Sequence, residues 1–228
     1  MIENNEVILI TGGAGLVGSI LCKELLKQKS KYKIYVIDNK NPDMCYENIS
    51  FACINICDYS SILEFIKEKE INVIIHLAAA LESSSIDKIN YVNRIGTNNI
   101  FKAALSCGIK RIIYASSVLV MYVYRLLKPY VDAHNNIPIK NFIKVTEKSK
   151  TITPKMNFEP DMYHKEYAES KLYGENLSKE YSTLHEISCI VIRFGWINKE
   201  NKSYQAPNWC SHQTACKVLI DSIEKQNI

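Results

Sequence analysis

Short apolar runs rich in β-branched residues alternate along the chain with longer amphipathic stretches. This alternation is typical of a parallel sheet with helices on both faces. The predicted strands are Val7–Ile10, Lys33–Ile37, Ile49–Cys53, Val73–Leu77, Arg111–Ala115 and Ser188–Arg193. The predicted helices are Leu16–Gln28, Tyr59–Lys69, Asn90–Cys107, Tyr167–Leu184 and Gln213–Lys225. Right-handed crossovers then give an α/β, doubly wound sheet, in which ligands bind at the carboxyl ends of the strands.

Two stretches depart from this alternation. Residues 122–160 contain Pro129, Pro138 and Pro154, mixed charge and several asparagines. They are too long for an ordinary loop, so we expect an irregular insertion or a functional lid. Residues 196–228 predict a short C-terminal substrate lobe, which indicates either a small substrate or a truncated chain. With 228 residues and 47% hydrophobic content, the chain is long enough for one sizeable core.

A glycine-rich turn, TGGAGLVGS, lies between the first predicted strand and the first predicted helix. Gly12 permits the tight turn, Gly15 lets a pyrophosphate approach the backbone, and Gly18 lets the helix pack on the strand. The helix N-terminus then faces the anion. Asp38 ends the next strand, where a carboxylate can bind the ribose hydroxyls of an adenosine. The combination predicts a single Rossmann-type, dinucleotide-binding domain over residues 1–228. An ordinary glycine-rich turn beside an incidental acid is the alternative.

Four further positions near the strand ends have structural as well as functional interpretations. Asp58 follows the third strand and either accepts a hydrogen bond from adenine or caps the next helix. Leu77–Ala80 either let a cofactor lie against the backbone or simply pack tightly. His76 lies in a buried apolar strand, which favours a hydrogen-bonded core histidine over a catalyst. Asn93, in a helix crowded with asparagine and threonine, is expected to hydrogen-bond to neighbouring loops.

A candidate catalytic pair opens the predicted helix Tyr167–Leu184. Tyr167 and Lys171 are four residues apart, so they lie on one face of the helix. A tyrosine hydroxyl with a pKa of about 10 is a poor acid–base group at neutral pH, but a neighbouring ammonium favours the phenolate. Ser116 and Ser117 end the fifth strand at the same sheet edge, where a hydroxyl can bind the reacting oxygen of a substrate. These groups predict general acid–base chemistry.

Composition and charge argue against several other classes. The net charge of +4 comes from 28 basic and 24 acidic residues with no dominant basic block, which disfavours nucleic acid or a membrane surface as the main partner. The eight cysteines are scattered, follow no secretory signal and lack paired CxxC spacing, so we expect reduced thiols, no metal and a cytoplasmic protein. The longest apolar run, Ile112–Tyr124, is shorter than the roughly 20 residues that span a bilayer.

Taken in order along the chain, these motifs resemble the extended short-chain dehydrogenase/reductase family, the NAD-dependent epimerase/dehydratase group. The matching segments are Thr11–Gly18, Asp38, Asp58, Leu77–Ala80, Asn93 with Gly96–Asn98, Tyr114–Ser117, Tyr167–Glu175 and Arg193–Gly195. The resemblance implies an NAD cofactor, selected over NADP by Asp38, and a catalytic triad of Ser117, Tyr167 and Lys171. The cofactor-binding residues that it implies are Gly12, Gly15, Leu16, Val17, Gly18, Asp38, Asn39, Asp58, Leu77, Ala78, Ala79, Asn93, Ala115, Tyr167, Lys171 and Phe194.

Within that family, the segment Asn208–Ser211 looks most like the corresponding part of uronate dehydrogenases. The residues expected at the substrate are nevertheless mostly apolar. They are Leu81, Ser117, Val118, Leu119 and Trp196. Because the hydroxyls of a sugar need hydrogen-bond partners when they are buried, this set argues against uronate itself.

The hypothesis from the sequence is an NAD-dependent oxidoreductase that transfers a hydride at a hydroxyl or carbonyl of a sugar-like or other small substrate. An NAD-retaining sugar or nucleotide-sugar epimerase uses the same residues and is one alternative. A non-catalytic NAD-binding sensor or scaffold is the other. Family habit also suggests a homodimer formed through the helices Asn90–Cys107 and Tyr167–Leu184.

Overall fold

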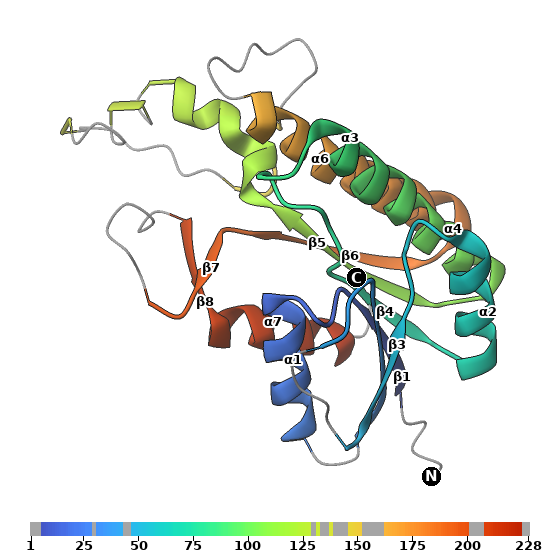
Figure 1. The fold of residues 1–228 in the computed structure, drawn as a ribbon. Helices are drawn as coiled ribbons and strands as arrows, with labels where there is room; N and C mark the ends of the chain where they lie inside the picture. The colour runs from blue at the N-terminus through green and yellow to red at the C-terminus, as the bar shows by residue number, and fades with distance from the viewer. Residues whose placement is uncertain are drawn as a thin grey trace.

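The computed structural model describes residues 6–28, 31–42, 47–128, 131–132, 137–138, 146–151, 162–200 and 208–224. Six parallel strands form one sheet in the order β3-β2-β1-β4-β5-β6 (Figure 1). Their bounds are β1 Glu6–Thr11, β2 Tyr32–Asp38, β3 Ile49–Cys53, β4 Val73–His76, β5 Arg111–Ser117 and β6 Ser188–Phe194. The strand order reverses at β1, with β2 and β3 on one side of it and β4, β5 and β6 on the other. In such a sheet this switch point is where ligands bind.

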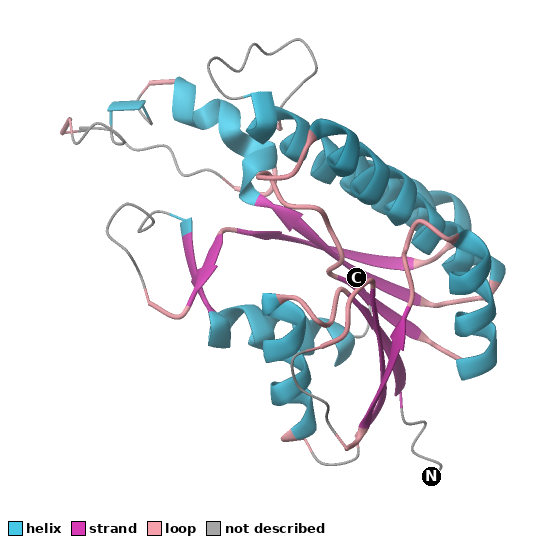
Figure 2. Cartoon of the chain, viewed as in Figure 1, coloured by secondary structure: helices cyan, strands magenta, loops and turns pink. Residues whose placement is uncertain are grey.

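Helices cover both faces of the sheet (Figures 1 and 2). Their bounds are α1 Leu16–Leu26, α2 Tyr59–Lys69, α4 Thr97–Ser106, α6 Met162–His185 and α7 His212–Glu224. One layer contains α2, α4 and α6, and the other contains α1 and α7. Leu9 and Ile74 pack in the core under the first layer, whereas Ile8 and Ile75 pack under the second. Because side chains alternate across each strand, β1 and β4 are buried on both faces, which explains their continuous apolar sequences.

Each predicted strand is present, with small differences in length. β5 extends to Ser117 and β6 to Phe194, whereas β4 ends at His76. The predicted helix Asn90–Cys107 is not regular throughout, because it opens with a π-helix, η1, over Asn90–Gly96 and follows a short helix α3, Ile86–Ile89. Wide π-helical turns are frequent at functional sites. The doubly wound α/β fold expected from the sequence is confirmed.

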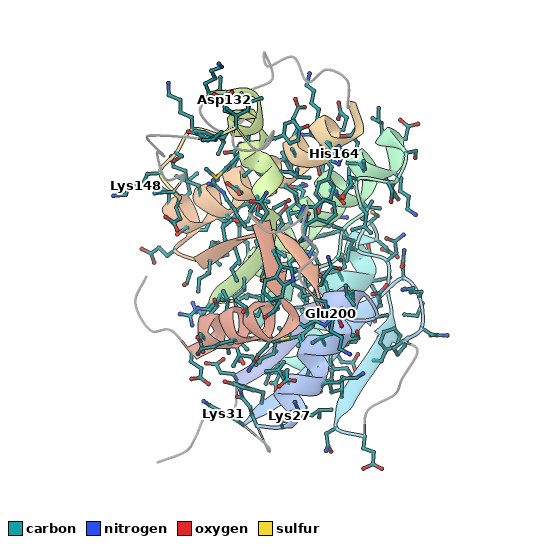
Figure 3. The ribbon with its side chains drawn as sticks, turned by 90° about the vertical axis from the view of Figure 1, so that its left-hand side faces the viewer. Lys27, Lys31, Asp132, Lys148, His164 and Glu200 are labelled. Atoms are coloured by element: carbon teal, nitrogen blue, oxygen red, sulfur yellow. The ribbon has the colours of Figure 1, made fainter. Side chains whose placement is uncertain are left out.

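The segment expected as an insertion or lid, residues 122–160, falls largely outside the described residues. Its beginning belongs to a 3₁₀ helix, η2, Val118–Leu126, which follows β5 directly. Lys148 is exposed, and in Figure 3 it lies with Asp132 at the opposite end of the molecule from Lys27. The lid therefore stays a prediction.

The C-terminal segment adds a small second sheet and a cover helix. β7, Trp196–Asn198, pairs in parallel with β8, Trp209–Ser211, beside the main sheet, and α7 follows β8 and packs on α1. Among the described residues, no helix is both long and apolar enough to cross a membrane. Over the same residues, no group of three or more histidine, cysteine or acidic side chains is placed to hold a metal ion.

Candidate active site

The glycine-rich turn connects β1 to α1 at the switch point. Gly12 has a φ of 75°, in the left-handed region, and a Cβ there would lie 2.6 Å from the backbone nitrogen of Ala78. A Cβ on Gly18 would lie 2.5 Å from the Gly12 carbonyl oxygen, so α1 packs directly on the turn. Gly15 differs, because a Cβ added there would approach only the Gly12 carbonyl oxygen, at 3.1 Å. The outer side of Gly15 is therefore open at the point where a pyrophosphate would approach.

The first turn of α1 also has the properties of an anion site. Gly15 is the N-cap residue, and no side chain caps this helix in the described part of the chain. Free backbone N–H groups and the positive end of the helix dipole then point outward from the turn. Leu16, the first residue of α1, is 57% exposed beside them.

Asp38 lies at the carboxyl end of β2, next to this turn. Its Oδ2 accepts a hydrogen bond of 3.0 Å from the backbone N–H of Ala14, and the side chain is largely buried. The contact directs the carboxylate toward the glycine turn, as ribose binding requires. Asn39, which follows, is exposed.

Asp58 caps α2. Its Oδ1 accepts from the backbone N–H of Ser61 at 3.2 Å, and its Oδ2 accepts from the Ser61 hydroxyl at 2.7 Å. These hydrogen bonds lower the pKa of the Asp58 carboxyl. The capping interpretation is confirmed, while the contact with adenine stays a prediction.

His76 is a buried, hydrogen-bonded residue of the core, as its apolar surroundings predict. Its Nδ1 shares a hydrogen bond of 2.7 Å with the Thr11 hydroxyl, and its Nε2 shares one of 3.0 Å with the Thr97 hydroxyl. Burial, and then the charge of Lys171, lowers the pKa of His76 from 6.5 to about 3. The Thr11 oxygen also accepts from the backbone N–H of Ala78 at 3.3 Å, so this neutral ring connects β1, β4 and α4 beside the glycine turn.

Asn93 connects the loop after β4 to α6. Its Oδ1 accepts from the Ala80 N–H at 2.7 Å, and its Nδ2 donates to the Ala80 carbonyl at 3.0 Å and to the Ser170 hydroxyl at 3.0 Å. The hydrogen bonding to a neighbouring loop that the sequence predicts is confirmed. Ser170 precedes Lys171, so Asn93 couples the loop expected at the cofactor to the helix that bears the candidate catalytic pair.

Lys171 is buried against β5. Its Nζ donates a hydrogen bond of 2.8 Å to the Ala115 carbonyl and lies 5.7 Å from the centroid of the Tyr167 ring and 5.3 Å from that of Tyr114. Burial lowers the pKa of Lys171 from 10.5 to about 8. The pKa of Tyr167 is raised, first by burial and then by the Glu82 carboxylate. This direction is opposite to the phenolate stabilisation expected from the sequence, because burial of the Tyr167 hydroxyl and the negative charge of Glu82 both disfavour the phenolate.

Ser117 is the last residue of β5 and the N-cap of η2. Its Oγ accepts a hydrogen bond of 3.2 Å from the Leu119 N–H. Leu119 and Ala80 pack with Tyr167 in one apolar cluster, so the structure brings the end of β5 and the start of α6 together.

The apolar residues expected at the substrate differ in their exposure. Val118 and Leu119 are half-buried, whereas Leu81 is 60% and Trp196 43% exposed. Trp196 stands opposite Trp209 in the small sheet. Leu119 is thus the member of this set that the structure places against Tyr167.

The other residues expected at the cofactor lie near the carboxyl ends of the strands, in the turns that follow them or at the start of α1. Val17 is in the first turn of α1, Leu77–Ala79 follow β4, Ala115 is in β5, and Phe194 ends β6.

Sequence reasoning gave no role to two charged side chains behind Lys171, Glu175 and Arg193, and it expected the Ser116 hydroxyl at the substrate, whereas this hydroxyl donates to Glu175. Glu175 accepts from the Ser116 hydroxyl at 2.6 Å, and Arg193 donates to both of its oxygens, from Nε at 2.8 Å and from Nη2 at 2.7 Å. A spacing of four residues from Tyr167 to Lys171 and again to Glu175 was the available signal, since it puts all three on one helix face.

Comparison with known proteins identifies the family of the chain. The model of the NAD dependent epimerase/dehydratase family matches residues 8–197, which is most of the chain. The chain belongs to this family. NAD is thus the cofactor of the family, and the resemblance inferred from the motifs is confirmed.

Relatives and solved structures extend the comparison. An uncharacterized protein of Methanocaldococcus jannaschii is 28% identical over 93% of this chain and 62% of its own length. L-arabinose 1-dehydrogenase (NAD(P)(+)) of Haloferax volcanii is 27% identical over 83% of this chain and 66% of its own. A mutant of uronate dehydrogenase from Agrobacterium tumefaciens, complexed with NAD, shares the fold with a TM-score of 0.72 and 20% identity, over 98% of this chain and 74% of that one. The chain thus spans less than two thirds of the length of both curated relatives.

Proposed function

We propose that the chain is an NAD-dependent oxidoreductase that exchanges a hydride at a hydroxyl or carbonyl of a sugar-like or other small substrate. The observation that carries the proposal is the buried face of α6, where Lys171 is hydrogen-bonded to β5 two residues before Ser117 and Tyr167 lies one helical turn away. NAD, when bound, supplies the hydride donor or acceptor.

The residues at the switch point fit a dinucleotide. The open outer side of Gly15 and the uncapped start of α1 suit a pyrophosphate, and the Asp38 carboxylate beside them suits ribose hydroxyls. A carboxylate at this position repels a 2′-phosphate, which supports NAD over NADP. Residues 196–228 are proposed to border the substrate, with Trp196 at their start.

Tyr167 is assigned the proton transfer. The Tyr167 hydroxyl, whose pKa burial raises, is protonated at neutral pH and can donate its proton to a carbonyl oxygen as a general acid. The Lys171 ammonium stabilises the phenolate that results. The Ser117 oxygen accepts from the Leu119 N–H, so its own hydrogen is available to hold the substrate oxygen.

The substitution Tyr167→Phe tests this assignment, since it removes the hydroxyl and keeps the ring. We expect kcat to fall by about 100-fold or more, while the Kd for NAD changes by less than about twofold. Turnover is measured as NADH formation or consumption with a panel of sugars, sugar acids and small alcohols and ketones. Tyr181→Phe is the matched control, because Tyr181 is buried on the same helix against Phe101, away from Lys171. Full turnover in Tyr167→Phe would contradict the proposal.

An epimerase that retains NAD is the second candidate, because the family whose model matches residues 8–197 contains epimerases by its description. Such an enzyme uses the same proton-transfer residues and returns the hydride to the substrate. NAD that stays bound through purification, with no net NADH from any sugar, would favour this candidate over the dehydrogenase.

A further inference from the structure

The ion pair between Glu175 and Arg193 lies directly behind the candidate catalytic groups. Glu175 is one turn after Lys171 on α6, and Arg193 lies opposite Ser116 in the ladder of β5 and β6. The two side chains are 11% and 20% exposed. Their pairing is bidentate, which is the strongest and most directional form of an arginine–carboxylate contact.

The pair has further contacts on both sides. Glu175 Oε1 also accepts from the Ser116 hydroxyl, and Arg193 Nη1 contacts the Met121 sulfur at 3.3 Å. Ser116 immediately precedes Ser117, and Met121 lies in η2, which Ser117 caps. The pair therefore connects α6 to the end of β5 and to β6, and through Arg193 also to η2.

We propose that Glu175 and Arg193 are positioning residues that hold the Tyr167–Lys171 face of α6 in register with Ser117 and balance the charge beside it. The inference rests on the proposed function, because it assigns the pair to the same acid–base groups. An error of about 1 Å in such a register can lower a rate by about 100-fold.

The electric field of the pair reaches the site. Burial, then Tyr167, and then the Glu175 carboxylate raise the pKa of Tyr114, the ring over which the Lys171 ammonium lies. A cavity of about 700 Å³ between α6, β6 and α7 is lined by both Glu175 and Arg193. The pair borders this cavity on its outer side, and we expect the Glu175 carboxylate to raise the pKa of Lys171 and the Arg193 guanidinium to lower it.

Other ionisable groups on the packed elements stay unchanged in the test. They include Glu147, which after Glu175 also raises the pKa of Arg193 and lines the same cavity, and these groups on the packed elements: His76 in β4, Glu82 after it, Asp87 and Lys88 in α3, Arg94 in η1 with its partner Glu169, Lys102 in α4, Arg111 and Tyr114 in β5, Tyr122 in η2, and His164, Tyr173 and Lys179 in α6. The difference between variants of the pair therefore reports on the pair alone.

Three substitutions separate charge from geometry. Glu175→Gln leaves a cation and should lower the pKa of Lys171, whereas Arg193→Gln leaves an anion and should raise it. Glu175→Asp keeps the charge but shortens the side chain, so it should lower kcat by about 10-fold or more without moving this pKa. The KM values for substrate and NAD should change by less than about threefold in all three variants.

The pKa of Lys171 is measured by NMR on the folded chain with lysine labelled at the side-chain nitrogen, assigned through Lys171→Met. Asp221→Asn is the control, because it removes an acid from the exposed Lys217–Asp221 pair on α7 and should shift nothing. Shifts of opposite sign, cancelled in the double variant, support the proposal. Shifts of the same sign, no shift, or full kcat in Glu175→Asp overturn it. The NMR titration needs no turnover, so absence of activity in the wild type would reject the proposed function and leave this test standing.

Discussion

The charge of His76 provides a direct test of the network at the switch point. The ring is buried between Thr11 and Thr97, and its pKa falls from 6.5 to about 3 on folding. A base with a lowered pKa takes up its proton more readily in the unfolded chain. The stability that its neutral form contributes is therefore complete above about pH 6.5 and is lost as the pH falls toward about 3.

The magnitude follows from the two pKa values. Between about pH 7.5 and pH 5, His76 alone should lower the free energy of unfolding by about 2 kcal/mol, and the full loss near pH 3 is about 5 kcal/mol. The range from about pH 7.5 to pH 5 is the informative one, because most carboxylates remain ionised there and contribute little to the change in stability. His76→Gln should remove this part of the slope, whatever the substitution costs at neutral pH through its lost hydrogen bonds.

Urea unfolding followed at several pH values measures the slope for both proteins. NMR of the histidine rings in the wild type tests the same point directly, since the His76 ring should show no titration down to about pH 5. Equal slopes in wild type and His76→Gln, or a His76 ring that titrates near its usual value of 6.5, would refute the reasoning.

Three further predictions concern the cofactor side of the site and Lys171. Asp38→Ala should bring the Kd for NADP within about 10-fold of that for NAD, measured by fluorescence titration, since the repulsive carboxylate is removed; unchanged discrimination would contradict this. Gly15→Val should weaken NAD binding by at least about 10-fold with little change in melting temperature, whereas Gly12→Ala, at a φ of 75° and 2.6 Å from backbone, should destabilise the fold itself by several kcal/mol. Lys171→Met should abolish turnover yet stabilise the fold by about 2 kcal/mol at neutral pH, because it removes a charge whose burial costs about 3 kcal/mol and loses one hydrogen bond worth about 1 kcal/mol. This gain in the free energy of unfolding should shrink as the pH rises from about 8 toward 10.5. A variant less stable than the wild type would contradict the prediction.

The sheet could be predicted from the sequence because its strands are short, β-branched and buried on both faces. Val7–Ile10 and Val73–His76 have no polar residue before their carboxyl ends, so their type and approximate bounds follow from local composition. The π-helix Asn90–Gly96 and the 3₁₀ helix Val118–Leu126 could not be predicted in this way. Each makes contacts with distant segments that local composition does not signal, Asn93 with Ser170 in the first and Met121 with Arg193 in the second.

The candidate site also has one part that the sequence predicts and one part that it does not. Its cofactor half depends on backbone conformation, and the glycines at 12, 15 and 18 signal that conformation in the sequence itself. The pairing of Glu175 with Arg193 is different, because it joins α6 to a strand that begins after that helix ends. The four-residue spacing places Glu175 on the same helix face as Tyr167 and Lys171, but which residue pairs with it depends on the register of β6 against β5.

Lys171 lies between the cofactor side of the site and the Glu175–Arg193 pair, and it bears on the choice between an enzyme and a scaffold. Its ammonium is buried with a single described hydrogen bond, to the Ala115 carbonyl, and holding it there opposes folding by about 3 kcal/mol. A protein that only binds a dinucleotide forms no phenolate at Tyr167 for this charge to stabilise. An acid–base catalyst does, and the charge stabilises the phenolate that forms when Tyr167 gives up its proton. The hydrogen bonds of Asn93 to Ser170, and of Ser116 and Arg193 to Glu175, hold the helix on either side of this lysine, which favours the enzyme.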